Sequence, residues 1–289
     1  MSWLQETEPI PEGYWGPVVW TKYIAEPVNT LTNLMFMGAA LYGMWRVYQQ
    51  RLPSRFIGGF AGLGLVGCGS FLFHMTLKHE AQLLDELPMI WASSYVSWSL
   101  LDQTLAYGKK VNPVVLPTVI FAIVTFISVT YVQNGNPVFH QVAYALIFGL
   151  TIIHGIHTLF SSKSPLAVSE SSRRMRSDVR RLQFFGTVTF LLGFLIWNTD
   201  NIFCGTLRVG RDIIGYPWAL LLEGHGWWHI LTCYGAYMLF VSMEAIVLPL
   251  MEHPDNFVMV MDIFPYVKRV QDDDPKRRLL NEYLAAKNK

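Results

Sequence analysis

Ser70 and His74 are four residues apart, and His225 and His229 repeat that spacing more than a hundred residues later. Residues four apart on a helix lie on one face, so each pair points both side chains the same way. Two imidazoles at this spacing, with a third from a facing helix, make a three-nitrogen site with a fourth position free for water, as in catalytic zinc sites. His74, His225 and His229 are therefore the predicted zinc ligands.

The sequence lacks the glutamate of a HExxH motif, so a general base must come from elsewhere. Asp85 follows His74 by eleven residues and would open a helix that re-enters from the same side. We predict Asp85 as the base that moves the proton of an attacking water. Ser70, one turn deeper than His74, is predicted to hydrogen-bond a developing oxyanion.

The same polar groups also have a purely structural interpretation. A HxxxH pair within a membrane span can serve helix–helix hydrogen bonding without holding a metal. Trp227 and Trp228 fit an aromatic belt at a membrane interface, which would explain polar neighbours without chemistry. Three further residues next to Asp85 are interpreted as solvated charges in the headgroup region: His79, Glu80 and Glu86.

Other polar positions leave two interpretations open. Glu26, Asn29 and Asn33 form a helical stripe that either holds its helix against neighbours or lets Glu26 bind a cation. Asp200 either orients a ligand imidazole or caps a helix end. His154 and His157 would lie across the bilayer from the other histidines, and we expect a structural role for them.

The composition predicts the class of protein that must position these groups. With 52% hydrophobic and only 15% charged residues, the chain is too apolar for a typical soluble domain, and we predict an integral membrane protein. A net charge of +1 gives no reason to expect nucleic acid as a partner. The cysteines (Cys68, Cys204 and Cys233) are too few for a disulfide framework and lack CxxC spacing.

A helix that spans a membrane needs about 20 mostly apolar residues, and the sequence contains seven such runs. The predicted spans are 28–48, 56–76, 83–101, 114–132, 138–160, 182–200 and 226–248. The fold class is thus all-α, a seven-transmembrane helix bundle, with residues 1–27 before it and a polar tail, 249–289, after it. The Ser- and Arg-rich stretch 161–181 is predicted to be a linker.

Orientation follows from the basic residues, because Lys and Arg accumulate in cytoplasmic loops. Eighteen of them fall in one alternate set of loops together with the tail, and four fall in the other set. The N-terminus is therefore predicted to be luminal and the C-terminus cytosolic, which requires an odd number of spans. No basic region precedes an apolar core near the N-terminus, so no cleaved signal peptide is expected.

Five stretches carry a resemblance to a known family: EGYWGP, YIAEPVNTLTNL, GSFLFHMTLKHEAQLLDELPM, WNTDNIFC and WWHILTCYGAYM. They closely resemble the alkaline ceramidases, within a superfamily of seven-span hydrolases that also holds the adiponectin-receptor-like proteins. The resemblance runs from Glu12 to about the seventh predicted span.

The resemblance implies a membrane amidase in the endoplasmic reticulum or Golgi. It implies zinc held by His74, His225 and His229, with Ser70 and Asp85 in catalysis. The implied substrate is ceramide, including phytoceramide or dihydroceramide, within the bilayer. The implied products are a sphingoid base and a fatty acid.

One departure from the family pattern affects a second cofactor. The family has an acidic loop of the type Asp-Trp-Cys-Glu-x-Asn between GYWGP and the Tyr-Ile-Ala-Glu that opens the first span, and about eleven residues are missing here. That loop resembles a calcium site, and Glu26 is the one plausible ligand left, whereas calcium takes six or more oxygens. Calcium is therefore doubtful, and Cys204 is expected to lack the partner that the loop would supply.

Two other function classes compete with the amidase. A seven-helix, lipid-binding, receptor-like protein would use the same metal only structurally. A metal transporter would need more carboxylates along the spans than this sequence has.

Overall fold

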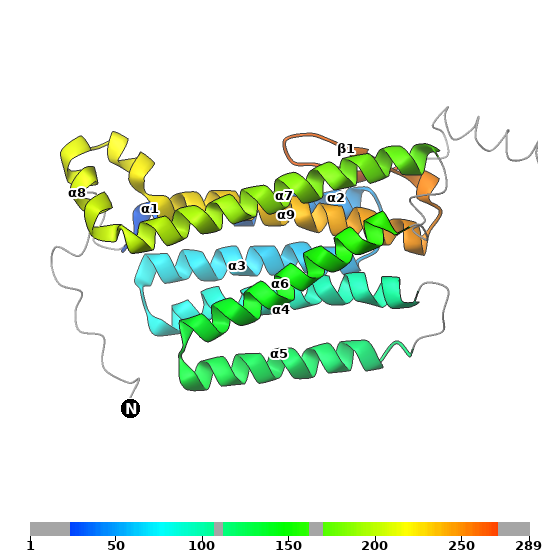
Figure 1. Cartoon of the computed structure of the whole chain (residues 1–289), viewed down its shortest axis with the longest axis horizontal. Helices are drawn as coiled ribbons and strands as arrows, with labels where there is room; N and C mark the ends of the chain where they lie inside the picture. Colours follow the sequence, from blue (N-terminus) through cyan, green and yellow to red (C-terminus); the bar gives the residue numbers. More distant parts are fainter. Residues whose placement is uncertain (1–23, 107–111, 162–169, 271–289) are drawn as a thin grey trace, which may run out of the picture.

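The computed structural model describes residues 24–106, 112–161 and 170–270, which form an elongated helical bundle (Figure 1). The long helices are α2 (Leu34–Gln49), α3 (Arg55–Thr76), α4 (His79–Ala106), α5 (Val115–Asn134), α6 (Pro137–Phe160), α7 (Glu170–Ile202) and α9 (Gly224–Met251). The short elements are α1 (Pro27–Thr32), α8 (Cys204–Ile214), two 3-10 helices, η2 (Trp218–Leu222) and η3 (Pro254–Asn256), and a hairpin of β1 (Phe257–Val260) and β2 (Tyr266–Arg269). The all-α prediction is confirmed apart from this hairpin.

Five of the described helices are long and apolar enough to cross a membrane, judged by length and composition. These are α3, α5, α6, α7 and α9. Helix α2 has only 16 residues, and α4 begins with His79 and Glu80, so neither resembles a simple apolar span. The chain is a multi-pass membrane protein, whereas the seven spans and the orientation remain predictions.

One predicted boundary is wrong. The first predicted span, 28–48, matches α1 and α2 together, with a one-residue break at Asn33, whose φ of −68° is still helical. The linker predicted over 161–181 ends early, because α7 already begins at Glu170. Arginine is a good helix former, and the buried Met175, Val179 and Leu182 recur at helical spacing along the start of α7.

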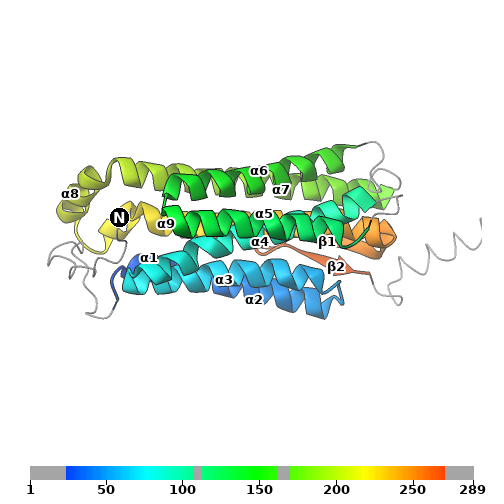
Figure 2. The ribbon, with the colours of Figure 1, turned by 90° about the horizontal axis from the view of Figure 1, so that it is seen from below.

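Helix α9 lies at the centre of the bundle and contacts helices on several sides (Figure 2). Most of its residues from His229 to Pro249 are buried. It packs closest to α7, where a Cβ on Gly235 would lie 2.8 Å from the Gly186 carbonyl oxygen. Small residues allow such close helix contact in membranes, so the two glycines fix α7 against the helix that carries His225 and His229.

The turns at one end of the bundle are short. Leu77, at φ 51°, follows α3, and α4 begins two residues later, so α4 re-enters from the side on which α3 ends. Helix α5 ends at Gly135, whose φ of 60° suits glycine, and the Asn136 side chain then caps α6 by accepting the Val138 N–H at 3.0 Å. These turns bring the starts of α4 and α6 close to the end of α3.

Candidate active site

Three histidines from two helices meet at one point. His74 lies in the last turn of α3, and His225 and His229 lie in the first turns of α9. The ring centroids are 4.7–4.9 Å apart, and one ligand nitrogen from each lies within 4.8 Å of the others. We call the end of the bundle that holds them the histidine end.

These residues fit a metal ion. His74 and His229 are only 3% and 4% exposed, and the Nε2 atom of His74 is buried without a hydrogen-bond partner. A buried polar atom without a partner is costly unless something unseen binds it. Three imidazole nitrogens are the donor set of a zinc site with a fourth position free.

The other ring nitrogens of two histidines are held by groups on or just before α1. Glu26 Oε2 lies 2.6 Å from His74 Nδ1, and the Thr32 hydroxyl lies 2.9 Å from His229 Nδ1. Thr32 donates to the Val28 carbonyl within α1, so its oxygen is free to accept from His229. Each Nδ1 is thereby occupied and each Nε2 left for a metal, which is how outer groups usually orient ligating histidines.

Glu26 therefore contacts a predicted ligand. Its backbone N–H also donates to the His74 carbonyl at 3.0 Å, which ties the start of α1 to the end of α3. Burial alone would raise the pKa of Glu26, but its hydrogen bonds with His74 and Asn29 act in the opposite direction, and the pKa lies below its ordinary value. The stretch in which the family has its acidic calcium loop, residues 16–23, lies outside the described residues.

Ser70 and Asp85 lie beside the histidines because α3 and α4 approach very closely there. Gly69 faces the Leu84 carbonyl, and a Cβ at this position would collide with that backbone. Asp85 is thereby near enough to interact with both Ser70 and His74. The structure thus brings together all five residues that the sequence predicts for zinc binding and catalysis.

Asn33 links the serine to the metal ligands. Its side-chain amide donates to Ser70 Oγ at 3.0 Å and lies 3.3 Å from His229 Nδ1. Asn33 is fully buried and Ser70 is 3% exposed, so water does not compete for these contacts. The Glu26–Asn33 stripe thus contacts the neighbouring helices, with the histidines as the partners, while cation binding by Glu26 stays a prediction.

Glu86 is not the solvated charge that the sequence suggested. The Tyr131 hydroxyl of α5 and the Gln82 amide both donate to its carboxylate, the latter at 3.2 Å. The imidazole Nε2 of His140 lies 2.8 Å from the Glu86 backbone carbonyl. These contacts from α5 and α6 fix the first turns of α4 next to Asp85.

The start of α9 is held by charged residues. Arg211 of α8 pairs with Glu223 at 2.7 Å, directly before the helix. The Asp200 carboxyl of α7 lies beside the first backbone N–H groups of α9, those of Gly224 and His225. This position next to the start of α9 fits a helix-end cap, but Asp200 Oδ1 is buried without a hydrogen-bond partner, so both roles of Asp200 stay predictions.

Aromatic residues surround the other side of the histidines. The Trp228 ring packs against Phe190, Phe194 and Trp197 of α7 at centroid distances of 5.8–6.0 Å. Trp227 is 38% exposed, as an interface residue would be. Only Trp227 therefore behaves like a belt residue, whereas Trp228 packs inside the bundle.

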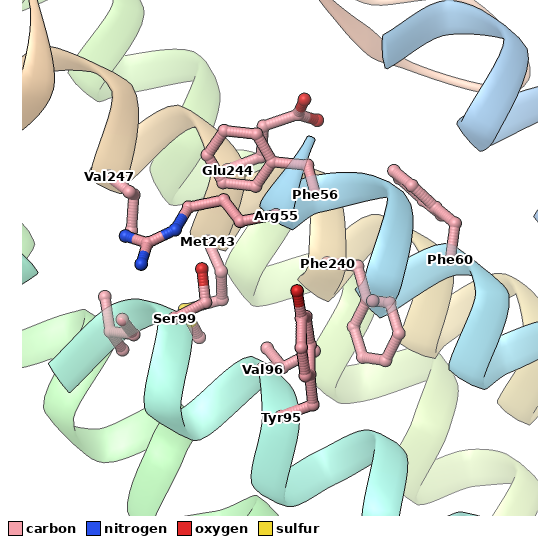
Figure 3. Close-up of a pocket in the computed structure, with 12 residues that line it drawn as sticks. Arg55, Phe56, Phe60, Tyr95, Val96, Ser99, Phe240, Met243, Glu244 and Val247 are labelled. Atoms are coloured by element: carbon pink, nitrogen blue, oxygen red, sulfur yellow. The ribbon is translucent and has the colours of Figure 1, made fainter. Parts of the chain in front are cut away.

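Polar residues far from the histidine end do not join this site. His154 lies 2.8 Å from the Thr104 hydroxyl, which fits its predicted structural role. Glu244 of α9 is 3% exposed and lines a cavity of about 20 Å³ with Arg55 and Ser99 (Figure 3). Fifteen residues of helix, roughly 22 Å, separate Glu244 from His229, so this cavity is not part of the site.

Comparison with known proteins decides the family. The family model described as ceramidase matches residues 18–268. This chain belongs to the ceramidase family. It is 39% identical over 232 residues to alkaline ceramidase YPC1 of Saccharomyces cerevisiae, covering 77% of this chain and 71% of the relative. It is 33% identical over 238 residues to alkaline ceramidase 3 of Mus musculus, covering 78% of this chain and 84% of that relative.

A more distant relative is the alkaline ceramidase of Arabidopsis thaliana, 24% identical over 235 residues. The resemblance inferred from the five sequence stretches is thus confirmed, and the ceramidase match covers every residue of the histidine site. Cys68, Cys204 and Cys233 are all free thiols in the structure, as expected for a member without the cysteine of the acidic loop.

Proposed function

We propose that this ceramidase is an intramembrane, zinc-dependent amidase. It hydrolyses the amide bond of ceramide, including phytoceramide or dihydroceramide, to a sphingoid base and a free fatty acid. The observation that carries the proposal is the convergence of three histidine nitrogens beside Asp85 and Ser70 in a chain of this family.

His74, His225 and His229 would hold the metal, with Glu26 and Thr32 fixing the orientation of two of the rings. When bound, zinc supplies Lewis-acid polarisation of the amide carbonyl and activation of water. The histidines serve this role best as neutral ligands, and their burial excludes competing bulk water from the ring nitrogens.

Asp85 is the proposed proton carrier of the reaction. It accepts a proton from the attacking water and returns it to the nitrogen of the leaving sphingoid base. Water adds to the carbonyl carbon and the carbon–nitrogen bond breaks, so a carboxylic acid and an amine result. Ser70 would support this step by turning its hydroxyl proton from the Asp85 carboxylate to the oxyanion, while Asn33 continues to donate to its oxygen.

Ceramide is a lipid, so it must reach the histidines from the bilayer. We place this access between α6 and α7, which contact each other much less than α7 contacts α9. Tyr144 and Phe148 of α6 face Phe190 of α7 there, and Trp228 continues the aromatic surface toward the histidines. Rings that accept acyl chains along this path would guide the amide group to the site.

The number of spans, their orientation and the membrane are proposed from the sequence. We propose seven spans with the histidine end luminal, in the endoplasmic reticulum or Golgi membrane, because the basic residues gather in the opposite loops. Glu26 acts in this proposal as a partner of His74, and calcium is not required.

The test is fatty-acid release from labelled ceramide by protein purified in detergent, with bound zinc measured on the same sample. Asp85→Asn keeps the size of the side chain but removes the base, so turnover should fall about 10²–10⁴-fold while zinc remains. Glu80→Gln, an exposed acid on the same helix, is the matched control and should keep wild-type turnover.

Two results would count against the proposal. Zinc without any fatty-acid release, over a broad range of pH and acyl chains, would favour the receptor-like protein with a structural metal. Full turnover in the Asp85→Asn protein would show that the base lies elsewhere.

A further inference from the structure

The chain after α9 does not leave the bundle as a polar tail. Residues 254–269 fold back along it, with β1 and β2 antiparallel and Val260 opposite Tyr266 next to the turn. β1 contacts α7, while β2 contacts α2 and α9 (Figures 1 and 2). The first twenty-one residues of the predicted tail 249–289 contain the end of α9 and this hairpin, and residues 271–289 lie outside the described part of the chain.

The base of the hairpin is tied to the end of the bundle opposite the histidines. The Arg269 guanidinium pairs with both carboxylate oxygens of Glu252, at 2.5 and 2.8 Å, and donates to the Gln50 carbonyl at 3.3 Å. The Arg46 guanidinium lies 3.7 Å from the centre of the Tyr266 ring. Bidentate pairing and cation–π contact both fix geometry, so the hairpin leaves this end in a set direction.

The tip of the hairpin is hydrogen-bonded to the middle of α9. The Tyr234 hydroxyl donates to the Ile263 carbonyl at 2.6 Å, and the Tyr237 hydroxyl donates to the Pro265 carbonyl at 2.9 Å. Phe264 lies between them, 5.2 Å from the Tyr237 ring. Tyr237 precedes Met251 by fourteen residues, roughly 21 Å of helix, so the tip lies near the middle of the predicted 226–248 span.

The two faces of the hairpin differ in their surroundings. Phe257 and Val267 are buried at 2% and 1% exposure, in the space between α2 and α7. Val258, Met261 and Ile263 point outward and are 42%, 47% and 76% exposed. An exposed apolar surface at this depth meets acyl chains rather than water.

The backbone of the tip is suited to such surroundings. Non-helical backbone at membrane depth must have its polar groups satisfied by protein. Two tyrosine hydroxyls donate to the Ile263 and Pro265 carbonyls, and the Asp262 carboxylate accepts a hydrogen bond from the Ile263 N–H at 2.9 Å. Asp262 is itself exposed at the tip, and its carboxylate satisfies a donor that lipid cannot.

We propose that residues 257–269 form a re-entrant hairpin embedded in the bilayer, with its outer face in contact with the acyl chains of the leaflet opposite the histidine end. Its inner face closes the bundle between α2 and α7. Lipid is thereby excluded on this side of α7, and the opposite side, toward α6, is left for substrate.

Spin labels on two positions of the same hairpin test the depth. Ile263→Cys places a label at the tip, and Lys268→Cys places one on an exposed residue near the base. Both are made after the exposed Cys68 and Cys204 are changed to serine, and the proteins are reconstituted in phosphatidylcholine vesicles. Collisions with oxygen, which concentrates in lipid, and with a water-soluble nickel chelate are measured by electron paramagnetic resonance.

The label at residue 263 should collide several-fold more with oxygen and several-fold less with nickel than the label at residue 268. Equal nickel access at the two positions would overturn the proposal, because the tip would then lie in water. Adding Tyr234→Phe and Tyr237→Phe should raise nickel access at residue 263, since the tip loses both anchors. Unchanged access in that protein would refute the anchoring role of the two tyrosines.

Discussion

The histidine end and the cavity beside Glu244 both bury polar side chains in an apolar bundle, but their arrangements differ. At the histidine end, a buried nitrogen without a partner, Nε2 of His74, lies close to two further imidazoles. At the cavity, Glu244 Oε1, Ser99 Oγ and Arg55 Nη1 also lack partners, and Arg55 pairs through its Nη2 with Asp102, at 2.7 Å. The donor chemistry separates the two regions: three imidazole nitrogens within 4.8 Å of one another can hold a metal ion, whereas the cavity combines one acid and one hydroxyl with an arginine that is already paired.

The largest effect is expected from removing one of the three imidazole ligands. His229→Ala should abolish stable zinc binding and cost several kcal/mol of transition-state stabilisation, a loss of about 10³-fold or more in fatty-acid release. His157→Ala, at an exposed histidine far from the site, should leave both unchanged. Metal content measured on the purified proteins decides the outcome, and wild-type zinc in His229→Ala would require a different ligand set.

The close approach of α3 and α4 gives the next largest effect. Gly69→Ala places a Cβ against the Leu84 carbonyl, so the helices must move apart. We expect a loss of about 1–3 kcal/mol in stability and about 10²-fold in turnover, because Asp85 and Ser70 shift relative to the histidines. Gly149→Ala, where a Cβ has open space, is the control. Equal melting temperatures and rates for the two variants would refute this packing argument.

A smaller effect is expected from the group behind the ligand. Glu26→Gln keeps the shape of the side chain but weakens its hold on His74 Nδ1, so zinc affinity should fall about 10–100-fold. Competition with a chromogenic chelator measures the affinity, with Glu80→Gln as the control. If zinc affinity stays at the wild-type value, Glu26 has no role in orienting the ligand.

The smallest effect is expected at the cavity beside Glu244. Glu244→Gln conserves shape in a cavity that takes no part in the reaction, so zinc content and fatty-acid release should match the wild type. A fall in release of about tenfold, equivalent to about 1.4 kcal/mol, would show that the two regions are functionally coupled.

Much of the site could be predicted from sequence because polar residues in apolar spans are rare. His74, His225 and His229 stood out for this reason, and Asp85 and Ser70 followed from their depth. Thr32 could not be found this way, because a threonine hydroxyl bonded to its own helix gives no pattern in the sequence. Glu244 did give a signal, a lone acid in an apolar run, and was overlooked.

The fold was predictable to a similar extent. Long apolar runs gave the helices, while the break at Asn33 and the early start of α7 depend on local packing that composition does not reveal. The hairpin was missed because its strands are short and lie within a charged tail. Phe257, Met259 and Val267 nevertheless supply the alternating apolar side chains that such strands need.

In our proposal, the three histidines hold a zinc ion on which ceramide hydrolysis depends. Its most direct test is to strip the purified protein with a chelator and then to titrate zinc back while following fatty-acid release. We expect release to be lost with the metal and to recover fully at one zinc per chain, but not in the His229→Ala protein. Undiminished release from the metal-free protein would contradict it.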